Sequence, residues 1–371
     1  FLLNCEWSAD ELGQRLPGAV KRYIAENDIH FYIIDANTIA HGLGLGNHAN
    51  MVLQAAFFRL AKIIPMEDAV GYMKDAVKKS YAKKGEAIIK KNMDAIDAGT
   101  GSVVRVDVPA AWKDAADEKR QVRADLPAFI KNLLVPINAQ KGDDLPVSAF
   151  IGYEDGTMPL GTSAYEKRGI ATELPVWSAD KCLQCNQCAY VCPHGVIRPY
   201  LLNDEERGGA PAGFETVEAK GAKAKGLFYS LQLSALDCTG CGNCVAVCPA
   251  KEKALAMTNA ADTSFDSAHW EYGLTLDEKD IFDVSSVKGS QFKTPLLEFS
   301  GACAGCGETP YAKLMTQLFG DRVYWANATG CSQAWGSAMP CIPYTKNKEG
   351  KGPAWSNSLF ENNAEFSLGM S

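Results

Sequence analysis

The chain has 371 residues, of which 47% are hydrophobic and 22% are charged, and its formal net charge is −7. This length exceeds what one compact domain usually holds, so we expect several domains. The acidic balance argues against nucleic acid as the main partner, because phosphate binding needs an excess of Lys and Arg, and no apolar run approaches the ~18 residues of a membrane span.

Residues 1–115 are predicted to form an α/β domain. The apolar run in residues 30–40 (HFYIIDANTIA) predicts a buried strand, and residues 101–109 (GSVVRVDVP) predict another. Residues 50–64 have helical spacing, with Asn50 placed to cap the helix. Residues 66–81 predict an amphipathic helix that is acidic early and basic late.

The composition then changes twice along the chain. Residues 116–175 are rich in charge, proline and glycine, and we expect a connecting segment with little core of its own. Residues 176–292 contain two cysteine-rich runs separated by a 45-residue insertion, residues 193–237. We therefore expect a separate small domain built around these cysteines.

From residue 293 the pattern becomes α/β again. Residues 294–299 (TPLLEF) and 322–329 (RVYWANAT) predict strands. Between them, TPYAKLMTQLFG predicts a helix that Thr309 caps and Gly320 ends.

Thirteen cysteines stand out in the composition. An odd total grouped in short motifs fits a disulfide framework poorly, whereas it fits metal binding in a reducing cytoplasm.

Two runs, CLQCNQCAYVCP (182–193) and CTGCGNCVAVCP (238–249), match the C-x2-C-x2-C-x3-C-P pattern of two-cluster ferredoxins. In that pattern the fourth cysteine of each run binds the cluster of the other run. Zinc is the alternative, but it does not need a third and fourth cysteine at these spacings twice. The runs predict two [4Fe–4S] clusters with these ligands: Cys182, Cys185, Cys188 and Cys248 for cluster one, and Cys238, Cys241, Cys244 and Cys192 for cluster two.

A third cysteine group lies in GACAGCGETPY (301–311) and ATGCSQAWG (328–336). It offers Cys303, Cys306 and Cys331, one thiolate short of the usual four. Cys341 is within reach in sequence, and the alternative is a cysteine beyond residue 371. His194, directly after Pro193, could hydrogen-bond near a cluster, although a partly exposed turn residue is the interpretation we favour.

The chain resembles the pyruvate:ferredoxin (flavodoxin) oxidoreductase family. The resemblance rests on GLGNHANMVLQAAFF, LPVSAFIGYEDGT, CLQCNQCAYVCPHG, GACAGCGETPYAKL and ATGCSQAWGSAMP and covers essentially the whole chain. It implies oxidation of pyruvate to acetyl-CoA and CO2 by a thiamine-diphosphate enzyme. It also implies that iron–sulfur clusters pass the electrons to ferredoxin or flavodoxin and that the enzyme is a homodimer.

The same resemblance implies that residues 1–115 are the C-terminal part of an α/β 2-oxoacid oxidoreductase gamma-type domain, and it implies roles for individual residues. Cys303, Cys306 and Cys331 match ligands of a third cluster, whose fourth ligand we expect beyond residue 371. Glu308 and Cys331 match positions that contact thiamine diphosphate, and residues 293–371 match the start of the domain that binds it with Mg²⁺. Asn50 and Asn92 match positions that contact coenzyme A. The pyruvate-binding and catalytic groups are expected outside this chain, which we expect to be a central part of a longer polypeptide.

Two other functions compete with this one. The protein could act on another 2-oxoacid, or it could be a non-catalytic electron carrier with docking domains on either side. For any of these functions, pyruvate oxidation included, docking of an acidic ferredoxin on this acidic chain would need a local basic patch. Lys220, Lys223 and Lys225 are candidates, with a solvated run of lysines as the alternative.

Overall fold

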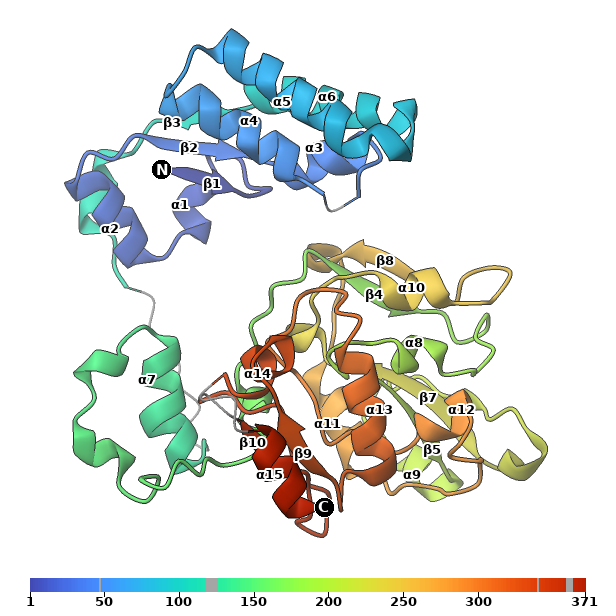
Figure 1. Ribbon diagram of the computed structural model, residues 1–371. Helices are drawn as coiled ribbons and strands as arrows, with labels where there is room; N and C mark the ends of the chain where they lie inside the picture. The colour runs from blue at the N-terminus through green and yellow to red at the C-terminus, as the bar shows by residue number, and fades with distance from the viewer. Residues whose placement is uncertain (47, 118–125, 339, 358–362) are drawn as a thin grey trace. The chain divides into compact units, whose positions relative to one another are not determined.

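The computed structural model describes residues 1–46, 48–117, 126–338, 340–357 and 363–371. The chain divides into two compact units, residues 1–123 and residues 124–371, which are described separately here (Figure 1). Most of the charged run that opens the expected connecting segment falls in 118–125, outside the described residues. No helix in the described part of the chain is long and apolar enough to cross a membrane.

The first unit is an α/β structure in which helices pack beside a small sheet (Figure 1). β2 is the central strand of the order β1-β2-β3; it pairs in parallel with β1 and antiparallel with β3. The elements in chain order are β1 (Leu2–Asn4), α1 (Leu12–Arg15), α2 (Gly18–Glu26), β2 (Phe31–Ile34), α3 (Ala36–Gly42), α4 (Asn50–Ala61), α5 (Met66–Tyr81), α6 (Glu86–Gly101) and β3 (Val104–Val106).

The elements predicted for this unit are present, with one error of detail. The two strands, β2 and β3, and the amphipathic helix α5 occur where the sequence patterns place them. Asn50 was predicted to cap α4, but the helix begins at Asn50, and Ala49 occupies the capping position without a side-chain hydrogen bond. α4 and α6 pack so closely that a Cβ on Gly99 would lie 2.3 Å from the Val52 carbonyl oxygen, so only glycine fits there.

The centre of the second unit is a ferredoxin-like arrangement. Antiparallel strands β4 and β8 form one layer, and β5, β7 and β6 form another, with the cysteine runs in the loops and short helices between them. The elements are β4 (Glu173–Trp177), α8 (Gln187–Tyr190), β5 (Ile197–Leu202), α9 (Asp204–Gly208), β6 (Val217–Glu218), β7 (Phe228–Leu233), α10 (Asn243–Val247), β8 (Leu255–Asn259), α11 (Ser267–Thr275) and α12 (Val287–Ser290).

The expectation that residues 116–175 have little core of their own is wrong for residues 129–138. A π-helical turn (Ile130–Leu134) leads directly into α7 (Val135–Asn138). Phe129, Ile130, Leu133 and Leu134 are buried together with Cys341. The prolines of this stretch hid the helix in the sequence, because Pro136 is tolerated in the first turn of α7 rather than ending a helix.

The C-terminal part of the second unit contains α13 (Thr309–Phe319), β9 (Tyr324–Asn327), α14 (Cys331–Gly336), β10 (Ala354–Asn357) and α15 (Asn363–Met370), with β9 and β10 paired in parallel. The predicted strand at 294–299 is wrong: its described contact is one isolated bridge between Leu297 and Tyr344. Gly320 follows α13 as expected, but Thr309 is the first helical residue and not its cap. The buried hydroxyl of Thr309 has no hydrogen-bond partner among the described residues.

Candidate metal centres

One cavity gathers the four cysteines predicted for cluster one. The first three come from the loop before and within α8, and the fourth, Cys248, comes from the end of α10. The remaining walls are mainly apolar, including Trp177, Tyr229 and Leu231. The cavity is lined by Cys182, Cys185, Cys188 and Cys248. The structure thus brings together the set that the motif pairs across the two runs.

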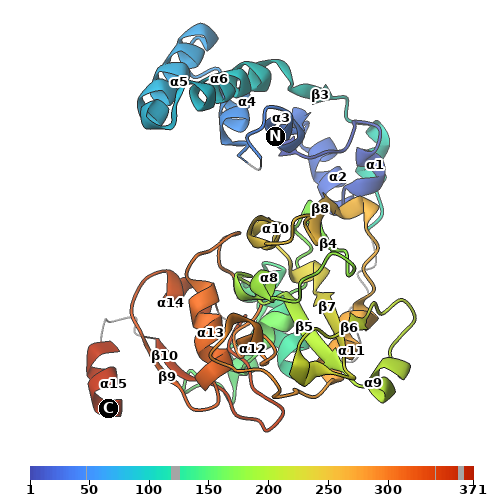
Figure 2. The same cartoon turned by 90° about the vertical axis from the view of Figure 1, so that its right-hand side faces the viewer.

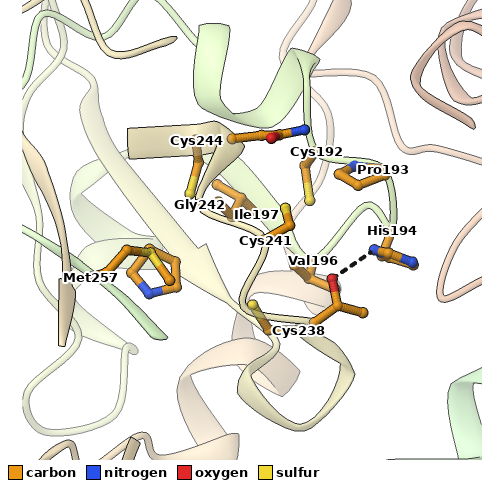
Figure 3. Close-up of a pocket in the computed structure, with 13 residues that line it drawn as sticks. Cys192, Pro193, His194, Val196, Ile197, Cys238, Cys241, Gly242, Cys244 and Met257 are labelled. Carbon is orange, nitrogen blue, oxygen red and sulfur yellow. Dashed lines mark hydrogen bonds between the residues drawn. The ribbon is translucent and has the colours of Figure 1, made fainter. Parts of the chain in front are cut away.

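A second cavity gathers the four cysteines predicted for cluster two, Cys238, Cys241, Cys244 and Cys192 (Figure 3). Figure 3 shows their sulfur atoms around one space, with Ile197, Val196 and Met257 beside it. Here Cys192 is the residue contributed by the other run. The crossed arrangement is therefore reciprocal.

The two runs adopt the same turn. In the first run, Gln184 and Asn186 have φ of 56° and 61°; in the second, Gly240 and Gly242 have φ of 66° and 75°. The backbone N–H of the first residue in each pair donates to a sulfur at 3.4 Å, Gln184 to Cys182 and Gly240 to Cys238. Such N–H groups stabilise negative charge on a sulfur.

These donor sets fit [4Fe–4S] clusters. Burial raises the pKa of the Cys238 and Cys244 thiols to about 12, and the neighbouring Cys192 adds to this. Burial raises the pKa of Cys188 further, again with other cysteines adding to the effect. Crowded, desolvated thiols cannot all ionise by themselves, whereas metal-bound thiols are deprotonated. The cavities therefore suit a group that carries its own positive charge.

The first run has side-chain partners that hold its turn. The Gln184 amide donates to the Glu218 carbonyl at 2.7 Å and accepts from the Lys220 N–H at 2.6 Å. The Asn186 amide donates to the Lys288 carbonyl at 2.8 Å, and the Tyr229 hydroxyl donates to it at 3.0 Å. Both residues are only 1% exposed. The insertion and α12 thus support the loop of the first run.

The third cysteine loop repeats part of this geometry. Gly305, between Cys303 and Cys306, has φ of 75°, and the Glu308 N–H donates to the Cys306 sulfur at 3.4 Å. A Cβ on Gly305 would lie 3.7 Å from the Cys241 side chain, so this loop packs against the second run.

Cys331 begins α14 and is exposed. The indole N–H of Trp335 on α14 donates to a Glu308 carboxylate oxygen at 3.3 Å, which ties this helix to the third loop. Cys303 lines a cavity together with His194 and Cys238, and that cavity contains neither Cys306 nor Cys331. The described residues thus place the three cysteines in neighbouring segments, and the cavity at Cys303 is not shared by the other two.

His194 is buried, so the interpretation as a partly exposed turn residue is wrong. Its Nε2 lies 2.9 Å from the Ala302 carbonyl oxygen, next to Cys303, and must carry the proton because a carbonyl only accepts. Nδ1 therefore accepts from the Thr239 hydroxyl at 3.5 Å, the contact drawn as a dashed line in Figure 3. Burial lowers the pKa of His194. This neutral ring connects the second run to the third loop.

Cys341 lies in the apolar cluster around the π-helical turn. The Asn138 amide nitrogen is 3.6 Å from its sulfur, and burial raises the pKa of the thiol to about 12. These contacts are those of a buried structural cysteine.

The two asparagines expected to contact coenzyme A differ in exposure. Asn50 is exposed in the first turn of α4. Asn92 is only 4% exposed, and its amide donates to the Ile88 carbonyl at 2.9 Å within α6. A ligand would reach Asn92 only if neighbouring side chains moved.

One functional candidate was missed in the sequence. Lys313 on α13 is 2% exposed, and its ammonium group donates to the carbonyls of Ala189 and Cys192. Burial lowers its pKa to about 8, and Cys192 acts in the opposite direction. A lysine in an amphipathic helix is normally solvated, so nothing local distinguishes this one.

Family models match three parts of the chain. Residues 1–102 match one described as pyruvate ferredoxin/flavodoxin oxidoreductase, and residues 181–252 match a 4Fe-4S dicluster domain. Residues 115–171 match a domain of unknown function.

Curated relatives match over the full chain. It is 57% identical to a pyruvate-flavodoxin oxidoreductase of Enterobacter agglomerans and covers 31% of that protein. It is 52% identical to a pyruvate:ferredoxin oxidoreductase of Moorella thermoacetica, covering 32%. It is 46% identical to a pyruvate dehydrogenase [NADP(+)] of Cryptosporidium parvum, covering 20%. The chain thus spans about a third or less of the length of these relatives.

Proposed function

The chain belongs to the family of pyruvate:ferredoxin and pyruvate:flavodoxin oxidoreductases, and on this premise we propose that its protein oxidises pyruvate to acetyl-CoA and CO2. Electrons would leave through iron–sulfur clusters to ferredoxin or flavodoxin. The family match and the two four-cysteine cavities support the role of this segment as the electron path.

The observation that carries this proposal is the succession of the three cysteine loops. The loop of Cys303 and Cys306 packs against Cys241 through Gly305, and His194 joins it to the second run. The second run in turn shares its ligand set with the first through Cys192 and Cys248. The structure therefore supports a path from a third centre through cluster two to cluster one.

We assign cluster one to Cys182, Cys185, Cys188 and Cys248, and cluster two to Cys238, Cys241, Cys244 and Cys192. The third cluster takes Cys303, Cys306 and Cys331, with its fourth ligand beyond residue 371. The clusters supply one-electron transfer. The chain's own residues exclude water, hold the loops and direct backbone N–H groups at the sulfurs.

At the other end of this path, residues 293–371 would begin the domain that binds thiamine diphosphate and Mg²⁺, with Glu308 and Cys331 contacting the cofactor. The cofactor supplies the carbon chemistry when it is bound. The hydrogen bond from Trp335 holds the Glu308 carboxylate beside the loop of Cys306. Coenzyme A would contact Asn50 and Asn92, and the enzyme would be a cytoplasmic homodimer.

The complete polypeptide, purified without oxygen, tests the proposal. We expect about twelve iron atoms per chain, from three four-iron clusters, and reduction of ferredoxin that requires both pyruvate and coenzyme A. A Cys241→Ala variant should lose ferredoxin reduction, while pyruvate still reduces the third cluster, as seen by electron paramagnetic resonance (EPR). Ferredoxin reduction at the wild-type rate in this variant would contradict the proposed path.

The competing functions have distinct outcomes in the same protein. If the complete enzyme turned over 2-oxoglutarate or 2-oxobutyrate in preference to pyruvate, its substrate would be another 2-oxoacid and the pyruvate assignment would be wrong. A polypeptide with neither thiamine diphosphate nor a third cluster would be an electron carrier without catalytic activity.

A further inference from the structure

The buried ammonium group of Lys313 lies between the two ferredoxin-type sites. α13 lies beside α8 in both views (Figures 1 and 2), and the side chain reaches the carbonyls of Ala189 and Cys192, the latter at 3.2 Å. Ala189 follows Cys188, which belongs to the cluster-one set, and Cys192 belongs to the cluster-two set. One charge is therefore close to ligands of both clusters.

Lys313 has no carboxylate partner of its own within the part of the chain that the structure describes. The nearby acidic group, Glu298, forms an ion pair with Arg198. Both of those side chains are largely buried, so Lys313 leaves this region with one unmatched positive charge. A buried ammonium group that lacks a counter-charge is strongly unfavourable.

We propose that Lys313 is the fixed positive charge that compensates clusters one and two and raises their reduction potentials. This inference rests on the proposed iron–sulfur function. Reduction adds negative charge to a cluster, and a nearby cation stabilises the reduced form. Because Lys313 is buried, solvent and salt screen its charge only weakly.

The second run offers a matched control. Lys253 donates to the carbonyls of Ala246 and Cys248, at 3.2 Å and 2.5 Å, near the end of α10. Cys248 is the fourth cysteine of the second run, as Cys192 is of the first. Lys253 therefore binds the carbonyl that corresponds to the one bound by Lys313. Lys253, however, is exposed. The two lysines make similar hydrogen bonds and differ in burial.

The experiment uses the complete iron-loaded enzyme with Lys313→Met, Lys313→Gln, Lys313→Arg and Lys253→Met. Iron content and reductive titrations followed by EPR give the loading and potential of each cluster. In both neutral variants of Lys313 we expect the reduction potentials of clusters one and two to fall by at least about 59 mV. For a one-electron couple, this corresponds to a tenfold change in the equilibrium constant for reduction. Lys313→Arg should stay near wild type, and Lys253→Met should shift less than a third as far.

Each outcome bears on the proposal. Unchanged potentials in iron-loaded Lys313→Met, or an equal shift in Lys253→Met, would overturn it. If both neutral variants lose iron while Lys313→Arg keeps it, the positive charge is required to hold the clusters, as proposed. If Lys313→Arg also loses iron, the role is packing and the proposal fails. Wild-type enzyme without iron in these sites would instead refute the proposed function.

Discussion

The two cysteine loops, residues 182–192 and 238–248, have the same cysteine spacing and the same turn, but they stabilise that turn by different means. The second loop uses Gly240 and Gly242, which adopt positive φ without strain. The first uses Gln184 and Asn186 at the same two positions. A repeated motif thus conserves backbone geometry while leaving the choice of support to the surroundings.

The difference follows from what covers each loop. Gln184 and Asn186 are buried against β6, β7 and α12, where their amides bind backbone groups and the Tyr229 hydroxyl. A Cβ on Gly242 would meet no heavy atom within 4 Å, so the second loop has no such cover at that point. At these two turn positions the first loop therefore relies on side-chain hydrogen bonds to distant segments, whereas the second relies on glycine, which needs none.

The largest expected effect tests whether the two loops are joined by crossed ligands. Cys192→Ala should remove cluster two, and a Cys192→Ala/Cys238→Ala double variant should lose no further iron, about four atoms in total. Cys192→Ala/Cys182→Ala should lose about eight, because its two cysteines belong to different clusters. Iron analysis of the anaerobic protein measures this. The reverse ranking of the two double variants would mean that each loop binds its own cluster.

A smaller effect tests the different supports. Asn186→Ala leaves the Tyr229 hydroxyl and the Lys288 carbonyl without their partner in a buried site, so we expect a loss of about 3 kcal/mol of stability. Gly242→Ala adds only backbone strain, about 1–2 kcal/mol. Urea unfolding of the iron-loaded protein, followed by fluorescence, compares the two.

Gly242→Asn is the matched control, because Asn tolerates positive φ better than Ala. It should be less destabilising than Gly242→Ala. An Asn186→Ala variant as stable as Gly242→Ala would show that the side-chain contacts of the first loop contribute nothing.

The contrast between the loops also marks the limit of sequence reasoning. The two groups of four cysteines that line cavities together could be predicted, because the repeated motif places the fourth cysteine of each run with the first three of the other. α5 could be predicted from its periodic apolar positions. The partners of Gln184 and Asn186 could not be predicted, since they come from residues 34 to 102 positions away. The same holds for Lys313, whose acceptors lie more than 120 positions away. The environment of these three side chains is set by segments far away in the sequence, which local sequence patterns do not encode.

The first loop also bears on where a partner would dock. Of the three lysines suggested as a basic patch, Lys220 donates to the Cys182 carbonyl at 2.7 Å and so belongs to the support of the first loop. Lys223 and Lys225 are exposed and form no hydrogen bond or ion pair among the described residues. The patch is therefore reduced to these two.

The smallest expected effect comes from that pair. Lys223→Ala/Lys225→Ala in the complete enzyme should slow ferredoxin reduction several-fold at low ionic strength, and the difference should vanish at high salt, because exposed charges act through screened long-range attraction. Lys346→Ala is the control and should have little effect, because this exposed lysine lines a cavity that contains no residue of either cysteine run. Rates measured over a salt series with acidic ferredoxin in excess give the comparison. An unchanged salt dependence would remove the basic patch from the proposal, while equal effects at Lys346 would show that the overall charge, and not the side of the first loop, governs docking.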